Sequence, residues 1–172
     1  KAIINGQVTT LNNIIKIKAG KNVSFAIDND FNLWAWGQGF NRYAQKVSGF
    51  DNVLDVTKDY VLKSDEKVYK ISDGTEVSTE KKVKALDEGY DHTVMLAEDN
   101  TAYAIGKNTY GQLGNGTYTD SDIVVAIRTT DGSNIVTNVK AVKAGKYNTI
   151  LITNDNKVYT VGSNENGKNG LD

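Results

Sequence analysis

The 172-residue sequence has no cysteine, no proline and a single histidine. Without cysteine there are no disulfides and no thiolate metal ligands, and the redox compartment is unmarked. Because His92 is the only histidine, no pair of histidines can bind a metal ion. The lack of proline matters less, since glycine and asparagine can form the turns of a protein.

Charge of one sign and long apolar runs are also missing. The 20 basic and 21 acidic residues nearly cancel, so no electrostatic footprint favours nucleic acid or an anionic membrane. No apolar run approaches the ~20 residues of a spanning helix, and no signal-peptide pattern is seen. We therefore expect no nucleic-acid partner and no membrane insertion. Because the chain begins at Lys1 rather than methionine, we expect a processed chain or an excised piece.

What the sequence does contain is a repeat, seen most fully in residues 88–116. Two glycines stand 17 positions apart three times, at Gly20 and Gly37, Gly89 and Gly106, and Gly145 and Gly162. Self-similarity at a fixed period is the signature of a repeat architecture. The positions between the glycines also agree, namely Ser24, Thr93 and Thr149; Ile27, Leu96 and Ile152; Asp30, Asp99 and Asp155; and Trp34, Tyr103 and Tyr159.

The repeats divide the chain into segments of one repeat domain, 1–172. Residues 14–51, 82–138 and 139–172 each form a repeat. Residues 52–81 form a degenerate repeat that lacks part of a strand, and residues 1–13 are expected to be the tail of a preceding repeat.

Short strands are predicted within each repeat. Residues 14–19 alternate β-branched and polar side chains, as an inner strand does. Residues 23–27 and 33–36 form a hairpin around a turn of Asp and Asn, and residues 122–127 can supply an outer strand. No segment has an apolar stripe of helical period. Three or four strands per repeat predict an all-β fold of about four β-propeller blades, each of which buries its faces only against its neighbours.

The repeat resembles that of the regulator of chromosome condensation family. The resemblance rests on Trp34-Ala35-Trp36-Gly37, on the strand 91–96, and on the string Asn-Thr-Tyr-Gly-Gln-Leu-Gly-Asn-Gly at 108–116. It implies a ring of seven blades, which about four repeats cannot close. We therefore expect an incomplete ring or part of a larger seven-bladed propeller, completed by more chain, a second copy or another protein. Exposed blade faces and sheet edges are normally covered.

Candidate chemical sites are few. The family resemblance implies that His92 is a structural hydrogen-bonding residue. Asp28-Asn29-Asp30 looks like the start of a calcium loop, but Leu33 and Gly39 stand where glycine and an acidic residue are needed, so a hairpin turn is predicted. The glycines of 106–116 lack a phosphate-loop motif. We expect no catalytic residue, no metal, no cofactor and no small-molecule substrate, and hence no enzyme.

Aromatic residues in the repeated strands are expected to pack between blades, whereas two tyrosines lie elsewhere. Tyr90 and Tyr147 directly follow a repeat glycine, in turns that converge on one face of a propeller. Family members commonly use such a face to engage another protein, and tyrosine suits that role. The predicted partner-binding residues, with ordinary surface as the alternative, are Lys21, Asn22, Tyr90, Asp91, Lys146, Tyr147 and Asn148. Weaker candidates, in the connections between blades, are Phe40, Tyr43, Tyr110 and Tyr118.

The leading functional hypothesis is a non-catalytic binding or assembly module whose partner is another protein or another copy of the chain. Abundant asparagine, lysine and isoleucine suggest a bacterial chain, and we expect it to be secreted or attached to the cell surface, with the cytoplasm as the alternative. The resemblance leaves other functions open: guanine-nucleotide exchange on a small GTPase, inhibition of an enzyme such as a β-lactamase, and a purely structural stalk.

Overall fold

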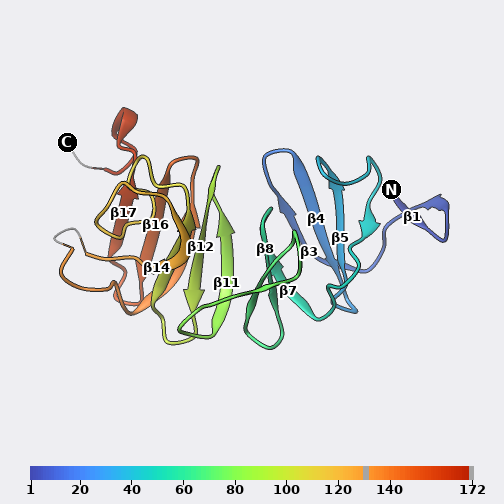
Figure 1. Ribbon diagram of the computed structural model, residues 1–172, viewed down its shortest axis with the longest axis horizontal. Coiled ribbons are helices and arrows are strands. Elements are labelled where there is room, and N and C mark those ends of the chain that lie inside the picture. The colour runs from blue at the N-terminus through green and yellow to red at the C-terminus, as the bar shows by residue number, and fades with distance from the viewer. Residues whose placement is uncertain (130–131, 171–172) are drawn as a thin grey trace. The chain divides into compact units, whose positions relative to one another are not determined.

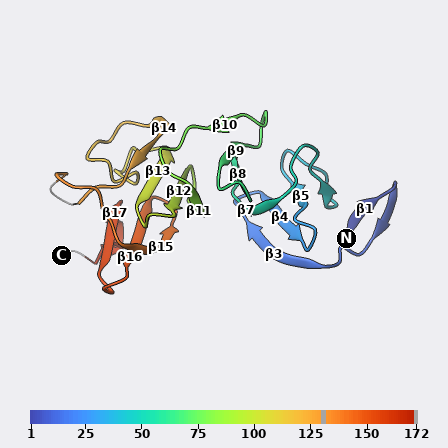
Figure 2. The ribbon, with the colours of Figure 1, turned by 90° about the horizontal axis from the view of Figure 1, so that it is seen from below.

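The computed structural model describes residues 1–129 and 132–170, and the chain divides into two compact units, Lys1–Glu76 and Val77–Asp172. Each unit is built from small antiparallel sheets (Figures 1 and 2). No helix in the described residues has the length and apolar character needed to cross a bilayer. The all-β fold of blade-like sheets predicted from the repeat is confirmed.

Unit 1 contains a short hairpin followed by two sheets. The hairpin pairs β1 (Ala2–Ile4) with β2 (Gln7–Thr9). The first larger sheet has the order β3 (Ile14–Ala19), β4 (Val23–Asp28), β5 (Leu33–Gly37), β6 (Gln45–Lys46). The second has the order β7 (Val53–Val56), β8 (Tyr60–Lys63), β9 (Val68–Lys70), β10 (Glu76–Val77), and its last strand spans the boundary between the units.

Unit 2 contains two sheets of the same design. The first runs β11 (Val83–Glu88), β12 (His92–Ala97), β13 (Ala102–Gly106), β14 (Ser121–Ala126), so the predicted outer strand near residues 122–127 is confirmed. The second runs β15 (Val139–Ala144), β16 (Asn148–Thr153), β17 (Val158–Gly162) and is followed by the 3-10 turn η1 (Glu165–Gly167).

The repeated glycines have a common structural cause. Gly37, Gly106 and Gly162 end β5, β13 and β17 with φ between 103° and 115°. At Gly106 an added Cβ would lie 2.6 Å from the carbonyl oxygen of Asp91, and Gly37 meets the carbonyl of Asn22 in the same way at 2.5 Å. A side chain is therefore excluded both by backbone conformation and by space. This explains why glycine recurs at the second position of each pair.

Each of the four large sheets also carries an irregularity in its first strand. The pairing shifts by one residue near the start of that strand, as a β-bulge does. The shifts lie between Ile14 and Lys16, Val53 and Asp55, Val83 and Ala85, and Val139 and Ala141.

Within each unit, consecutive sheets pack face to face. In unit 1, Phe25 and Ile27 of β4 share a core with Val53, Val56 and Val61 of the next sheet. In unit 2 a core joins the two sheets, with β15 beside β11 and β12 (Figure 2). Its members from the first sheet include Val94, Leu96, Ala102 and Ala104, and those from the second include Val142 and Leu151.

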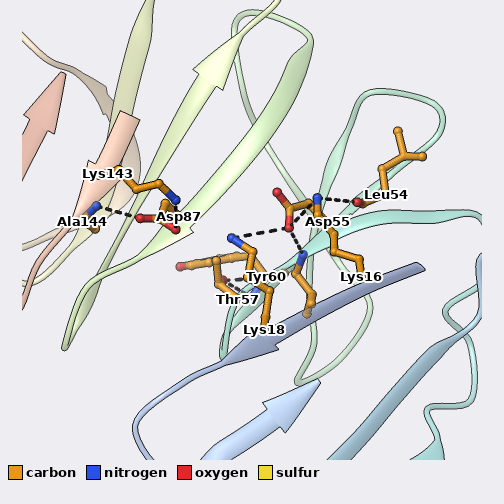
Figure 3. A network of polar contacts seen from close by, with 10 residues as sticks. Lys16, Lys18, Leu54, Asp55, Thr57, Tyr60, Asp87, Lys143 and Ala144 are labelled. Carbon is orange, nitrogen blue, oxygen red and sulfur yellow. Dashed lines mark hydrogen bonds and ion pairs between the residues drawn. The ribbon is translucent and has the colours of Figure 1, made fainter. Parts of the chain in front are cut away.

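The first strands of consecutive sheets are further joined by a buried or half-buried carboxylate (Figure 3). In unit 1, Asp55 of β7 is 4% exposed and lies 3.1 Å from the Nζ of Lys16 and 3.7 Å from that of Lys18, both on β3. In unit 2, Asp87 of β11 lies 3.2 Å from the Nζ of Lys143 on β15. Each unit therefore has an ion pair between its sheets.

Candidate functional site

Two turns of unit 2 approach each other closely, and tyrosines extend from them. One joins β11 to β12 and contains Tyr90; the other joins β15 to β16 and contains Lys146 and Tyr147. The backbone N–H of Tyr90 donates to the carbonyl of Lys146 at 3.3 Å. A Cβ on Gly89 would lie 2.7 Å from the carbonyl oxygen of Gly145, so this approach requires glycine.

Three tyrosine rings and one lysine form what we call the tyrosine cluster: Tyr90, Tyr110, Lys146 and Tyr147. The rings of Tyr110 and Tyr147 stack with centroids 4.6 Å apart, and Tyr90 meets Tyr147 edge to face at 5.8 Å. The Nζ of Lys146 lies 4.9 Å from the ring centroid of Tyr147 and 5.3 Å from that of Tyr90. Both ring arrangements and the cation–π contacts are favourable geometries.

Tyr110 is held in place by a hydrogen-bonded connection between β13 and β14. Its backbone N–H donates to the Oε1 of Gln112 at 2.9 Å, and Gln112 is buried. The fully buried Asn108 accepts from the N–H of Leu113 at 2.9 Å, and its amide donates to the carbonyls of Thr117 and Thr119. The motif at 108–114 therefore fixes the loop from which Tyr110 projects.

His92 begins β12 and is a buried link between the two sheets. It is 3% exposed, and its Nε2 is 3.0 Å from the Oγ1 of Thr149. That hydroxyl donates to the carbonyl of Gln112 at 2.8 Å, so it accepts from the Nε2–H of a neutral imidazole. Burial lowers the pKa of His92 to about 4, although the negative charges of Asp87 and Asp91 act to raise it. A neutral hydrogen-bonding role agrees with the structural one that the resemblance implies.

The predicted binding residues are divided between the two units. Tyr90, Lys146 and Tyr147 belong to the tyrosine cluster, and Asp91 is exposed in the same turn as Tyr90. Lys21 and Asn22 are exposed in the β3–β4 turn of unit 1, where the Asn22 amide donates to the Oε1 of Gln38 at 2.7 Å. Asn148 begins β16 and is 8% exposed.

Sequence reasoning ranked Tyr110 below these residues because it lies outside the repeat turn. The stacking partner of Tyr110 is Tyr147, 37 positions further along the chain, so no local pattern points to the contact. Tyr118, from the same connection, is 75% exposed.

Metal binding, the other chemistry considered for this chain, has little support in the described residues. The described residues contain no group of three or more His, Asp or Glu side chains that could hold a metal ion. The carboxylate of Asp28 instead accepts hydrogen bonds from the backbone N–H groups of Asp30 and Asn32, at 3.0 and 2.9 Å, and from the Nε1 of Trp34 at 2.8 Å. The hairpin turn predicted here is confirmed by the pairing of β4 with β5.

Comparison with known proteins relates the chain to one family. Two models of the regulator of chromosome condensation (RCC1) repeat match it, one at residues 81–112 and 139–168 and the other at residues 99–152. Protein pim1 of Schizosaccharomyces pombe is 30% identical over 171 residues, covering 93% of this chain and 29% of its own. Protein RCC1 of Candida albicans is 29% identical over 168 residues, covering 94% of this chain and 34% of its own.

Solved structures show the same fold. Yeast RCC1 (Prp20), in its structure with Kap60, superimposes with a TM-score of 0.72 at 16% identity, over 96% of this chain and 47% of Prp20. Human WBSCR16 has a TM-score of 0.72 at 13% identity, over 87% of this chain and 47% of its own.

The chain spans about a third of the length of these curated relatives, at 29% and 34%. The family models nevertheless cover residues 81–168 without a gap, and the fold is that of family structures. The chain belongs to the regulator of chromosome condensation (RCC1) repeat family.

Proposed function

We propose that this chain is a non-catalytic protein-binding module that engages its partner through the tyrosine cluster. The observation that carries the proposal is the stack of Tyr110 on Tyr147, with Tyr90 and Lys146 against it, on turns that glycines bring together. Tyr110 is 47% exposed, so one face of an already ordered aromatic group is open to a partner.

The physical argument rests on preorganisation. A tyrosine buries a large area on binding, and it loses little conformational entropy when its neighbours already hold the ring. The stack and the Gln112 hydrogen bond do this for Tyr110. Lys146 places a positive charge beside the rings, so the favoured partner surface offers an apolar or aromatic side chain with an acidic group next to it.

What is known of the solved relatives supports a protein-binding function in general terms. Yeast Prp20 has been solved in complex with Kap60, and its binding to Gsp1p and histones has been studied. Those partners are Prp20's own. The chain covers less than half of that protein, so nucleotide exchange on a GTPase stays an alternative to binding alone.

The test uses the purified chain immobilised as bait in an extract of its own cells, with each captured protein quantified. Tyr110→Ser and Tyr147→Ser remove one half of the stack each. If the cluster is an anchor of at least 2 kcal/mol, either change should weaken capture of the partner by about 30-fold.

Tyr118→Ser is the matched control, because Tyr118 is 75% exposed but takes no part in the cluster. It should capture the partner as the unchanged chain does. If every captured protein binds the Tyr110→Ser and Tyr147→Ser variants as well as the unchanged chain, the cluster is not the binding site.

We separately propose a secreted or cell-surface location, with the cytoplasm as the alternative, because the composition suggests a bacterial chain and bacterial proteins that resemble this family are often secreted or surface-attached. The relatives named above come from eukaryotes and do not bear on it. Fractionation of the source cells with an antibody to the chain tests the location. Recovery in the cytoplasmic fraction alone would contradict it.

A further inference from the structure

The two faces of a sheet in this repeat carry different, recurring positions. In unit 2, Val94 of β12 and Ala102 of β13 lie on the face that packs against the following sheet, and both are fully buried. Val142 of β15 and Leu151 of β16 lie on the opposite face, toward the preceding sheet, and are 6% and 1% exposed. One complete interface between sheets is therefore visible within unit 2.

The last sheet repeats the first half of this interface, and none of the described residues covers it as the last sheet covers the one before. Ile150 occupies the repeat position of Val94, five residues after Gly145 as Val94 is after Gly89, and it is 37% exposed. Val158 pairs with Ile152 just as Ala102 pairs with Leu96, and it is 62% exposed. Ile150 and Val158 are thus exposed apolar residues at repeat positions whose equivalents in the preceding sheet, Val94 and Ala102, are buried.

The first sheet of unit 1 repeats the other half of the interface. Ile17 stands three residues before Gly20, as Val142 stands before Gly145, but Ile17 is 74% exposed whereas Val142 is 6% exposed. Trp34 holds the repeat position of Tyr159, which packs on the core between the sheets of unit 2. Trp34 is only half-buried.

The polar residues match as well. Between the sheets of unit 2, His92 donates to Thr149. Asn148 occupies the repeat position of His92 in the last sheet, and Ser24 occupies that of Thr149 in the first. An amide donor, buried beside Gly145, and a hydroxyl acceptor therefore occupy on these two sheets the places where the existing interface has its hydrogen bond.

We propose that the chain binds a second copy of itself head to tail. The β15–β17 face carrying Ile150 and Val158 of one copy packs on the β3–β5 face carrying Ile17 and Trp34 of the other. The occupant is assigned because both halves of an interface already formed in unit 2 recur on this chain. Such a contact joins two different surfaces, so the pair keeps one free face of each kind, one on each copy, for a further contact.

The test measures mass by light scattering over a concentration series. The unchanged chain should rise from 18.8 kDa toward twice that mass or a higher multiple. Ile17→Lys and Val158→Lys each place a charge at one half of the interface, and each variant alone should remain at 18.8 kDa. Because both side chains are largely exposed, neither change should disturb folding.

Mixing the two variants gives the decisive result. The Val158→Lys copy keeps its Ile17 face and the Ile17→Lys copy keeps its Val158 face, so the mixture should form a one-to-one heterodimer. An interface between two like faces could not be restored in this way. Ile123→Lys is the matched control, since Ile123 is 73% exposed on β14, and it should associate as the unchanged chain does.

A chain that stays at 18.8 kDa throughout, or a mixture that stays monomeric, would overturn the proposal and assign the two faces to further blades, of a longer chain or of another protein. The result is independent of the tyrosine cluster. Tyr110→Ser and Tyr147→Ser should leave self-association unchanged.

Discussion

Asp87 of β11 joins its sheet to the next one through Lys143 of β15, with 3.2 Å between its Oδ1 and the lysine Nζ (Figure 3). Its Oδ2 accepts the backbone N–H of Ala144 at 2.9 Å. In unit 1 the charges are exchanged, because Lys16 and Lys18 lie on the earlier strand and Asp55 on the later one. Different residues therefore make the same kind of connection between consecutive sheets.

Replacing Asp87 by alanine should destabilise unit 2 mainly through the backbone hydrogen bond. The carboxylate is 16% exposed, and a hydrogen bond to a charged group contributes about 1.5–3 kcal/mol. We expect a loss of that size in the free energy of opening, measured by hydrogen exchange of the amides of β11 and β15.

Lys143→Ala separates the two contributions. Lys143 is 73% exposed, and an exposed ion pair is worth about 0–1 kcal/mol. Lys143→Ala should therefore lower the free energy of opening much less than Asp87→Ala does. Equal losses would show that the ion pair, rather than the hydrogen bond to Ala144, holds the sheets together.

The sequence predicts the hairpins well and the contacts between sheets poorly. Glycine at Gly37 and Gly106 and the Asp-Asn turns are local requirements of the backbone, so they recur at fixed spacing and can be recognised. The pairing of Asp55 with Lys16, or of His92 with Thr149, joins residues 39 and 57 positions apart in different repeats, and the repeat pattern does not show which residues meet.

The same distinction between local and distant contacts explains which parts of the candidate site the sequence predicts. Tyr90 and Tyr147 share a repeat position and could be paired from the sequence, whereas Tyr110 meets Tyr147 only through the folding of the 108–114 loop. Asn148 looks like a turn residue, but it begins β16 and is buried because its side chain occupies the space beside Gly145.

The turn between β4 and β5 in unit 1 depends on Asp28, which is 8% exposed. Burial alone would raise the pKa of Asp28, but the hydrogen bonds from Trp34 and Asn32 outweigh it and lower the pKa below 3.8. Asp28→Ala should cost about 2–4 kcal/mol, since several donors lose a charged acceptor. Both tryptophans of the sequence lie in unit 1, so urea unfolding followed by tryptophan fluorescence reports this loss.

Asp30→Ala is the control for Asp28, because Asp30 lies in the same turn but is exposed. Its effect should be within about 0.5 kcal/mol of zero. A comparable loss for both variants would mean that the turn depends on net charge rather than on the Asp28 hydrogen bonds.

Phe31 should be replaceable with a gain in stability. It has φ of 60°, and the equivalent turn positions are Asn100 and Asn156, with φ of 64° and 63°. Asparagine tolerates this left-handed conformation better than a bulky side chain does. Because Phe31 is 41% exposed, Phe31→Asn gives up little burial and should stabilise unit 1 by about 0.5–1 kcal/mol in the tryptophan assay. A destabilised variant would show that packing of the Phe31 ring outweighs the backbone strain.

His92 should make the stability of unit 2 depend on pH. Its folded-state pKa of about 4 lies below the ordinary 6.5, so the unfolded chain binds the extra proton first as pH falls. The stabilisation is complete above about pH 6.5, is lost progressively down to about pH 4, and amounts to roughly 3 kcal/mol.

His92→Asn, which copies the residue at the equivalent position 148, should flatten this part of the profile when hydrogen exchange of β12 and β16 is followed against pH. Carboxylates titrate similarly in the His92→Asn variant and in the unchanged chain. The difference between the two stability profiles therefore isolates the contribution of the imidazole. Parallel profiles would mean that His92 accepts a proton without disrupting its bond to Thr149.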